Sequence, residues 1–436
     1  MNTHSTNCRW NSVPLHCLSL IIKGVTYAKE DIGVSGEGYI PILRANNIQS
    51  DELDFHNLVW VCEERISKEQ LLCLGDVVVA TSSGSKHLVG KTASFRGEQK
   101  ISCGAFCAIL RPNSLINNLF FKYFFQTQSY RNHISSLAKG SNINNLKNAD
   151  LANVQVPVPP LAEQKRIVKK IEELFGIIDK TVKYLNDTKQ HLAQYRQSVL
   201  QQSFSGKLHK TTVWSQNSLN DLCKYIQRGK SPKYITHSTL PVINQKCIRW
   251  NELQIQYLKF IDPVQFESWI RERHVQPMDI LWNSTGTGTI GRAYLYQGTE
   301  LEDAVVDSHV TIVRADAKKI NPNFLFFYIQ SPFIQRKIEK MQSGSTNQVE
   351  LARKEIQNIQ VNLPSLPEQK AIVAKIETAF AAADKAEKAI SAALEQAKQF
   401  KQSILKRAFE GKLVPQDPND EPVDLSQLNT HKGKSK

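Results

Sequence analysis

The chain contains one long segment twice, 205 residues apart. The first copy starts at Leu161 with the run LAEQKRIVKKIEELF, and the second starts at Leu366 with LPEQKAIVAKIETAF; ten of these fifteen positions are identical. The copies stay in register to Leu208 and Leu413. An internal repeat constrains the architecture before any local feature does. Two copies are too few for a solenoid, and the period leaves room for a whole domain between them. The repeat therefore predicts a pseudo-two-fold molecule.

Both copies are predicted to be long helices, because prolines stand at their starts and Gly206 and Gly411 at their ends. A helix of about 45 residues is roughly 65 Å long. Apolar residues recur at a 3-4 spacing, which favours a coiled coil over helices that pack only on their own domains. Antiparallel pairing is the arrangement compatible with pseudo-two-fold symmetry. The predicted seam is Val168, Ile171, Phe175, Ile178, Val182, Leu185, Leu192, Val199, Val373, Ile376, Phe380, Ile390, Leu394 and Ile404. Polar interruptions at Lys189, Arg196, Glu387 and Lys401 could fix its register.

The regions before the two helices resemble each other more weakly. Short β-branched runs predict strands, Gly and Ser clusters predict loops, and the aromatic runs 120–125 and 324–328 are predicted to be core helices rather than base-stacking platforms. The predicted fold is α+β: two similar mixed α/β domains separated by two long helices that form an antiparallel coiled coil. The predicted segments are 1–156, 157–208, 209–361, 362–413 and a flexible tail, 414–436.

The formal net charge of +14 indicates a polyanionic partner, with nucleic acid as the first candidate and a membrane surface as the second. No apolar run reaches the roughly 18 residues of a membrane span, and no signal peptide is visible, so a cytoplasmic location is expected. The eight cysteines form no C-x-x-C pair. They are expected to be reduced, buried thiols rather than metal ligands.

Two motifs could indicate an enzyme. Gly286–Gly291 reads G-x-G-x-x-G, but a strand rather than the required helix is predicted to follow. Asp76, with Glu98 and Lys100, could form a metal-nuclease constellation, although the second half keeps Asp279 without an E-x-K after it. We therefore expect neither a catalytic site nor a metal site in the chain.

Polar, basic loops recur in both halves and are the predicted DNA contacts. Arg, Asn and Gln can read base edges, whereas Lys and Ser can hold phosphates. Ordinary turns rich in Gly, Ser and Asn are the alternative. The predicted contacts are Arg44, Asn46, Asn47, Lys86, Lys91, Lys139, Ser141, Asn142 and Asn144 in the first half, and Asn244, Lys246, Arg249, Asn283, Arg292, Ser343, Ser345, Thr346 and Gln348 in the second.

Over nearly its whole length the sequence resembles the specificity subunits of Type I restriction-modification systems. The resemblance is carried by the segments 159–168, 366–373 and 411–422, and by 41–48 in the first domain. It implies two target-recognition domains that each read half of a split site in double-stranded DNA. It also implies that the helices set the half-site spacing and dock two methyltransferase subunits, which two restriction subunits join.

The same resemblance implies that the chain is not itself catalytic. No cofactor is expected in it, while S-adenosylmethionine, ATP and Mg would serve the partner subunits, which methylate adenine and cleave DNA. No membrane partner is expected. Two other functions remain open at this point. One is a self-sufficient metal-dependent DNA nuclease, and the other is a coiled-coil scaffold that binds no DNA.

Overall fold

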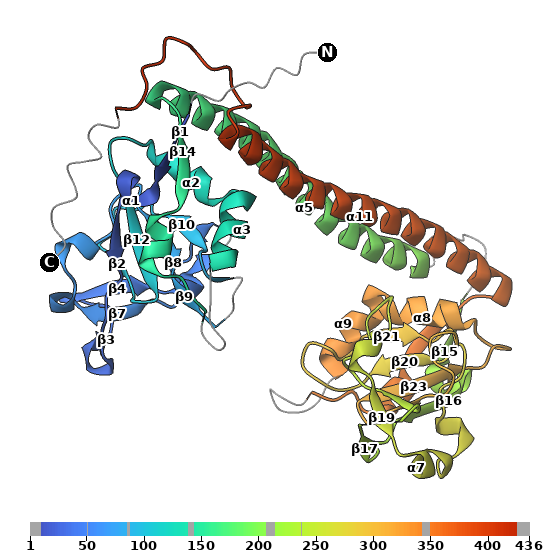
Figure 1. Ribbon diagram of the computed structural model, residues 1–436. Coiled ribbons are helices and arrows are strands. Elements are labelled where there is room, and N and C mark those ends of the chain that lie inside the picture. The colour runs from blue at the N-terminus through green and yellow to red at the C-terminus, as the bar shows by residue number, and fades with distance from the viewer. Residues whose placement is uncertain are drawn as a thin grey trace. The chain divides into compact units, whose positions relative to one another are not determined.

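The computed structural model describes residues 10–49, 51–84, 88–137, 144–205, 214–236, 238–341 and 349–424. The chain forms two compact units (Figure 1). Unit 1 consists of Met1–Tyr184 with Ala392–Lys436, and unit 2 of Leu185–Ser391. The long helices α5 (Leu161–Phe204) and α11 (Leu366–Phe409) each begin in one unit and end in the other. Each unit therefore contains one globular domain and half of each long helix.

Two four-stranded sheets form the centre of unit 1. The first has the antiparallel order β10 (Thr92–Ser94), β8 (Val77–Ala80), β12 (Cys107–Pro112), β2 (Ser19–Lys23). The second has the order β11 (Ser102–Cys103), β4 (Tyr39–Leu43), β7 (Val59–Cys62), β3 (Ile32–Gly33), with β11 parallel to β4. Three two-stranded ribbons pair β1 (Asn11–Pro14) with β14 (Gln155–Val158), β5 (Ile48–Gln49) with β6 (Glu52–Leu53), and β9 (Ser82–Ser83) with β13 (Asn144–Asn145). The helices are α1 (Leu15–Leu18), α2 (Asn118–Phe125), α3 (Gln128–Leu137) and α4 (Asn148–Ala152).

Unit 2 repeats this topology. Its first sheet has the order β16 (Cys223–Arg228), β23 (Val310–Ala315), β20 (Ile280–Asn283), β21 (Ala293–Leu295). Its second has the order β17 (Tyr234–Ile235), β19 (Lys259–Ile261), β18 (Pro241–Ile243), β22 (Val305–Val306), with β22 parallel to β18. The ribbon β15 (Ser215–Ser218) with β24 (Gln360–Leu363) corresponds to β1 with β14. The helices are α6 (Leu219–Leu222), α7 (Pro263–Glu267), α8 (Pro322–Gln330), α9 (Pro332–Met341) and α10 (Arg353–Asn358). The prediction of two similar mixed domains is confirmed.

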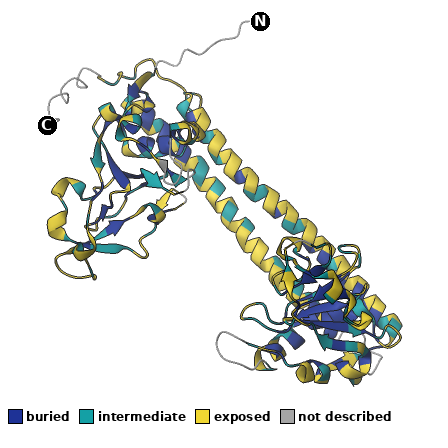
Figure 2. Ribbon diagram, turned by 60° about the horizontal axis from the view of Figure 1, so that its bottom comes forward, coloured by how far each residue is buried: buried dark blue, intermediate teal, exposed yellow. Residues whose placement is uncertain are grey.

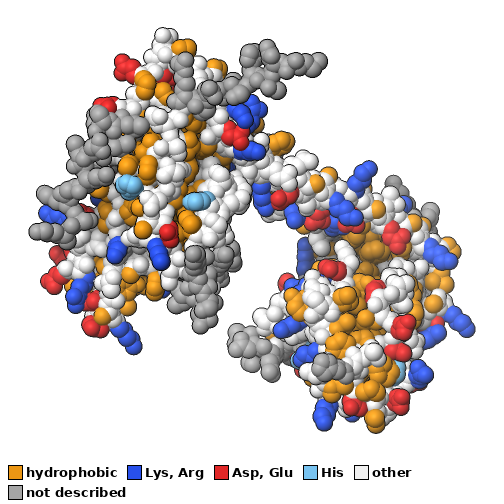
Figure 3. Space-filling model, in the orientation of Figure 1, with side chains coloured by type: hydrophobic (Ala, Val, Ile, Leu, Met, Phe, Trp, Pro, Cys, Tyr) orange, Lys and Arg blue, Asp and Glu red, His pale blue; other side chains and the backbone are white. Residues whose placement is uncertain are grey.

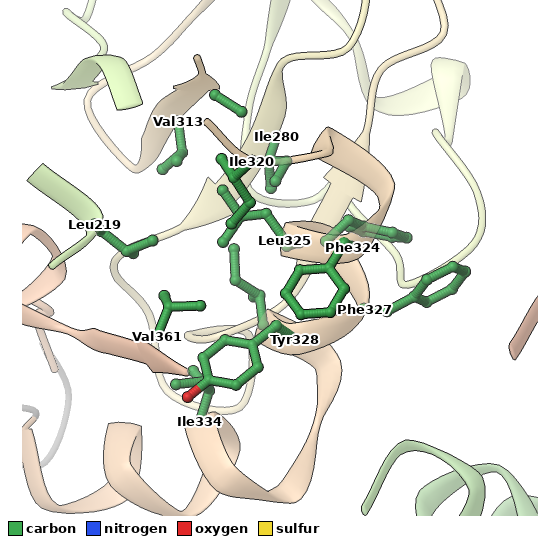
Figure 4. Packing of buried hydrophobic residues seen from close by; sticks show 14 of the residues in the cluster. Leu219, Ile280, Val313, Ile320, Phe324, Leu325, Phe327, Tyr328, Ile334 and Val361 are labelled. Atoms are coloured by element: carbon green, nitrogen blue, oxygen red, sulfur yellow. The ribbon is translucent and has the colours of Figure 1, made fainter. Parts of the chain in front are cut away.

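The aromatic runs form core helices, as predicted. In α2 and α8 the aromatic side chains are buried, and Figure 4 shows Phe324, Phe327 and Tyr328 of α8 among the apolar residues of the unit 2 cluster. Each helix is capped by an asparagine, since the side-chain oxygens of Asn117 and Asn321 accept two backbone N–H groups each. The burial map in Figure 2 shows the buried residues of each unit concentrated in its globular part. The Phe runs are therefore unavailable for base stacking.

The repeated Glu-Gln pair explains why both helices begin alike. The amides of Gln164 and Gln369 are fully buried. Gln164 Oε1 accepts the N–H of Asn117 at 2.7 Å, and its amide nitrogen donates to the Pro159 carbonyl at 2.8 Å. Gln369 makes the matching bonds to Asn321 at 2.7 Å and Pro364 at 2.9 Å. Each long helix is thereby locked to the cap of its domain's aromatic helix.

The two long helices run antiparallel within each unit. In unit 2, Lys189 and Arg196 of α5 pair with Glu387 and Asp384 of α11, in reverse order along the chain. In unit 1, Lys401 pairs with Asp179. The polar interruptions of the seam thus bond across the pair, as expected of groups that fix register.

The predicted seam residues are all buried or half-buried. Those near the helix ends also belong to the domain cores: Ile171 lies in the unit 1 cluster and Ile376 in the unit 2 cluster. The far ends of the helices dock in the same way, with Phe409 against Phe120 at 4.7 Å between ring centroids and Phe204 against Phe324 at 5.2 Å. Packing on the partner helix and packing on the domain therefore occur together, although the sequence presented them as alternatives.

The tail prediction was wrong for residues 414–424. Val414 and Val423 pack against the unit 1 core. Arg166, in the first turns of α5, donates to both carboxylate oxygens of Asp420, at 3.0 and 2.5 Å. That hydrogen bond also lowers the pKa of the Asp420 carboxyl. The proline and acidic content suggested a solvated tail because the partner surface, 254 residues away in sequence, was not visible. Residues 425–436 lie outside the described part.

The structure refines two further sequence expectations. The strands β14 and β24 cross the predicted boundaries at 156 and 361, since each pairs with the first strand of its own domain. Cys103, Cys107 and Cys247 are buried as expected, whereas Cys73 is exposed; Cys8 is not described. Among the described residues, no helix combines the length and apolar character that a membrane span requires.

Candidate nucleic-acid interface

Two polar loops that are far apart in the sequence meet residues 349–351 at one edge of unit 2. The Asn283 amide donates to the carbonyl of Gln245 at 3.1 Å, which ties the loop after β20 to the loop after β18. The N–H of Gly286 donates to the Val349 carbonyl at 3.1 Å, and that of Leu351 donates to Ser284 at 2.8 Å. The structure therefore brings together the predicted loops 244–249 and 283–292, with Val349 and Leu351 beside them.

Unit 1 builds the same edge. Ser83, after β8, pairs with Asn144 in the ribbon of β9 and β13, and the N–H of Leu146 donates to the Thr81 carbonyl at 2.8 Å. Leu43 and Ile48, which flank the Arg44 loop, share a buried cluster with Ala80. The described parts of the predicted loops thus lie at equivalent places in the two units.

The G-x-G-x-x-G run is a hairpin loop and not a dinucleotide-binding turn. It joins β20 to the antiparallel β21, as the sequence predicted. Gly286, Gly288 and Gly291 have φ values of 97°, 76° and 87°, which non-glycine residues rarely adopt. Trp282 Nε1 donates to the Gly291 carbonyl at 3.0 Å and holds the loop on the core.

Six predicted contacts remain accessible at these edges. Arg44, Asn46 and Lys246 are exposed, and Lys91, Arg249 and Arg292 are half-buried. Two of the arginines are braced by backbone: Arg44 donates to the Asn57 carbonyl, and Arg249 to the carbonyls of Lys246 and Ile248, all at 3.0 Å. Bracing of this kind reduces the side-chain entropy that binding would cost. Their role in DNA contact stays a prediction.

Three predicted contacts, Asn47, Asn244 and Asn283, have buried side chains that bond within the protein. The amide of Asn47 is enclosed by the Arg44 N–H and the carbonyls of Asp54 and His56. Asn244 donates to Tyr257 and accepts from the Lys246 N–H. Asn283 is fully buried and bonds to the Gln245 loop. Asparagine at a turn commonly bonds the local backbone, which competes with a role in recognition.

The remaining predicted contacts are not placed by the structure. Lys86, Lys139, Ser141, Asn142, Ser343, Ser345, Thr346 and Gln348 lie outside the described residues. Asn144 is described only through its backbone pairing. Their contact with DNA stays a prediction.

Sequence reasoning missed Gln245, although it named the loop that contains it. Gln245 is half-buried, and Thr289 Oγ1 donates to its side-chain oxygen at 3.3 Å. A glutamine held in this way can present its amide nitrogen to a base or phosphate. The bond to Thr289 crosses 44 residues and leaves no local signal in the sequence.

Two residues of the supposed nuclease constellation, Asp76 and Lys100, are bonded to other partners. Asp76 is 1% exposed and bonds to the guanidinium of Arg111, at 2.8 and 3.0 Å, and to the Cys73 N–H. The hydrogen bond to Asp76 raises the pKa of the Arg111 guanidinium. Lys100 pairs with Glu63 instead of facing Asp76. In the described part of the chain, no group of three or more His, Cys, Asp or Glu side chains is placed to hold a metal ion.

Unit 2 contains the same ion pair. Asp279 is fully buried, accepts two bonds from Arg314 at 2.7 Å and accepts the Gln276 N–H at 2.8 Å. Burial raises the pKa of the Asp279 carboxyl, and the bonds from Arg314 and Gln276 act against that rise. A pair that recurs at the same place in both domains is part of the shared framework.

Charge does not by itself mark the interface. On the face shown in Figure 3, Lys and Arg side chains are scattered over each unit and along the helices rather than collected in one stripe. The loop edges are therefore identified by their convergence and their accessible polar side chains.

Comparison with known proteins gives one consistent result. The family model for the Type I restriction modification DNA specificity domain matches residues 9–187 and again residues 213–396. The specificity subunit of the Type I restriction enzyme EcoKI, from Escherichia coli strain K12, is 31% identical over 97% of this chain and 93% of its own length. The StySPI specificity subunit from Salmonella potsdam is 32% identical over the same shares of the two chains.

Two solved structures share the fold. One comes from a study of complex assembly and conformational transition of the type I R-M system; it matches 93% of this chain and 98% of its own, with a TM-score of 0.70 and 19% identity. The other, the HsdS subunit from Thermoanaerobacter tengcongensis, matches 93% of this chain and 97% of its own, with a TM-score of 0.51 and 18% identity. At such identities these likenesses concern the fold alone.

Proposed function

The chain belongs to the Type I restriction-modification DNA specificity family, and from this premise we propose how it selects DNA. Each unit reads one half of a bipartite site in double-stranded DNA through its loop edge. The observation that carries this proposal is that the two units share one structural framework but differ in the side chains of their loops. Both units share the sheets, the Asp–Arg pair and the helix lock, whereas the side chains of their loops differ.

The repeat also supports a proposal for partners. Two copies of one helix segment present the same surface twice, so two copies of one methyltransferase subunit can dock, and restriction subunits join through them. The chain itself supplies specificity and no catalysis. Adenine methylation with S-adenosylmethionine, and cleavage with ATP and Mg, belong to the partners. We place the complex in the cytoplasm.

Binding to DNA is expected to depend strongly on salt. If the complex with methyltransferase neutralises six or more phosphates, its affinity should fall by roughly 10³-fold between 50 and 200 mM salt. The measurement is titration of a labelled duplex at several salt concentrations. Lys246→Ala should lower the slope of log affinity against log salt concentration by about one. Lys354→Ala, at an exposed position of α10, is the control and should leave that slope unchanged. An affinity that stays constant across this range would contradict a DNA-binding function.

The helices are expected to set the half-site spacing. Removing one heptad from each, Val182–Thr188 and Ala392–Lys398, keeps the Asp179–Lys401 and Arg196–Asp384 pairs on either side. The helices then shorten by about 10 Å, which corresponds to roughly three base pairs at 3.4 Å each. Sequencing of methylated adenines should show half-sites closer by that amount. Alanine replacements in the same heptads, without deletion, should leave the half-site spacing unchanged. An unchanged spacing after the deletion would show that the helices do not set it.

A further inference from the structure

One turn is built identically in the two units and carries a different side chain in each. In unit 1 it is Gly104–Phe106, between β11 and β12, and in unit 2 it is Asp307–His309, between β22 and β23. Cys107 in unit 1 and Val310 in unit 2 follow the turn and hold equivalent register positions on β8 and β20. Phe106 and His309 therefore occupy the same place in the fold.

The same four backbone hydrogen bonds hold both turns. In unit 1 they run from Gly104 to Leu43, Cys107 to Gly104, Gly24 to Cys107 and Thr81 to Phe106, at 2.8, 2.8, 3.1 and 2.9 Å. In unit 2 they run from Asp307 to Ile243, Val310 to Asp307, Gly229 to Val310 and Ser284 to His309, at 3.1, 3.2, 2.9 and 3.0 Å. Backbone bonds at every corner make the turn a rigid support for the residue at its tip.

A glycine beneath each turn completes the match. A Cβ at Gly24 would lie 2.1 Å from the Gly104 carbonyl oxygen, and one at Gly229 would lie 2.3 Å from that of Asp307. Only glycine allows the backbones to approach so closely. The duplicated glycine is explained by this support, which both units require.

The residue at the tip stands beside the loop edge. The Phe106 carbonyl accepts the N–H groups of Thr81 and Ser82, which follow β8. The His309 carbonyl accepts the N–H of Ser284, which follows β20. The tip is therefore bonded to the start of the loop after the central strand in each unit. Phe106 is 66% exposed, and His309 is exposed too. A lone exposed aromatic side chain is ordinary. This one differs because the fold holds it rigidly where the polar loops converge.

We propose that this position reads a base in each half-site: Phe106 contacts a thymine methyl group, and His309 hydrogen-bonds a base edge. Apolar contact with the thymine 5-methyl is a direct readout available to phenylalanine. In unit 2, Thr285 Oγ1 lies 2.6 Å from His309 Nδ1, which orients the ring and leaves Nε2 for the base. The inference rests on the proposed function and names residues that act in it.

The test uses the full chain with its methyltransferase subunit in a host, with methylated adenines mapped by sequencing. Phe106→Ala should weaken discrimination at one T·A pair of one half-site by about tenfold, and Phe106→Leu should retain most of it. His309→Phe should alter one position in the other half-site only. Leu74→Ala is the matched control, because Leu74 is 70% exposed in the same domain but precedes β8, at the end away from the loops.

The possible outcomes distinguish failure of the reading position from failure of the proposed function. If the wild-type complex methylates no bipartite motif, the proposed function and the inference both fail. If the wild-type motif is bipartite but Phe106→Ala and His309→Phe leave it intact, only the reading position is refuted. A uniform loss of methylation at an unchanged motif would also refute it, since a wedge or a merely structural residue would act in that way.

Discussion

Ile376→Asp is expected to destabilise unit 2 strongly. Ile376, in α11, is fully buried. It packs in the cluster that contains Phe324 and Phe327 of the domain and Leu200 of α5. The substitution removes that packing and buries a carboxylate without a partner. The expected cost is about 4 kcal/mol or more, which is a large part of the 5–15 kcal/mol that stabilises a typical domain. Ile171→Asp should act likewise on unit 1.

Tryptophan fluorescence during urea unfolding can follow unit 2, because it holds four of the six tryptophans, including the buried Trp282. Ala374→Asp is the control, since Ala374 is exposed two residues earlier on the same helix, and it should cost little. Assembly with the methyltransferase, measured on a sizing column, should fail for Ile376→Asp but not for the Ala374→Asp control. If the Ile376→Asp variant forms complexes and unfolds as the wild type does, Ile376 is not part of a buried helix seam.

Asp279→Ala is expected to cost unit 2 about 3–5 kcal/mol, because it breaks a buried ion pair by removing one partner. The Arg314 side chain is only 15% exposed, so its charge would remain largely buried. The Gln276 N–H would lose its acceptor as well. The same fluorescence measurement reports the change in the free energy of unfolding.

The double variant Asp279→Leu with Arg314→Met is the informative comparison. Replacing both charges by apolar groups often restores stability, so it should recover most of the loss. Asp76→Ala should cost unit 1 less than Asp279→Ala costs unit 2, because Arg111 is 23% exposed and better solvated. A double variant as unstable as the single one would show that packing, rather than an unpaired charge, causes the loss.

Much of the framework could be predicted from sequence. The repeat predicted two similar domains and two long helices, and the 3-4 spacing predicted residues that are now seen to be buried or half-buried. These features lie in local periodicity and in comparison of the chain with itself, both of which sequence contains. The strand after Gly291 was predictable for the same reason, since Ala293–Leu295 lies in a short run with two tyrosines, which are enriched in strands.

The binding loops were predicted less well. Their convergence was not visible, because the bonds that unite them join residues such as Asn283 and Gln245, 38 positions apart. Three asparagines were chosen for their chemistry and proved to be internal supports. Phe106 and His309 were not chosen, because no local pattern distinguishes an exposed tip on a rigid turn from any other loop residue.

The sequence therefore settles which segments are duplicated, where the long helices begin and end, and to which family the chain belongs. It does so because identity, periodicity and proline or glycine punctuation are properties of short stretches. The fold settles which polar groups face solvent, why Gln164 and Gln369 are repeated, and where the segment 414–424 packs. Those properties depend on burial and on hydrogen-bond partners supplied by distant segments, such as Asp420 for Arg166.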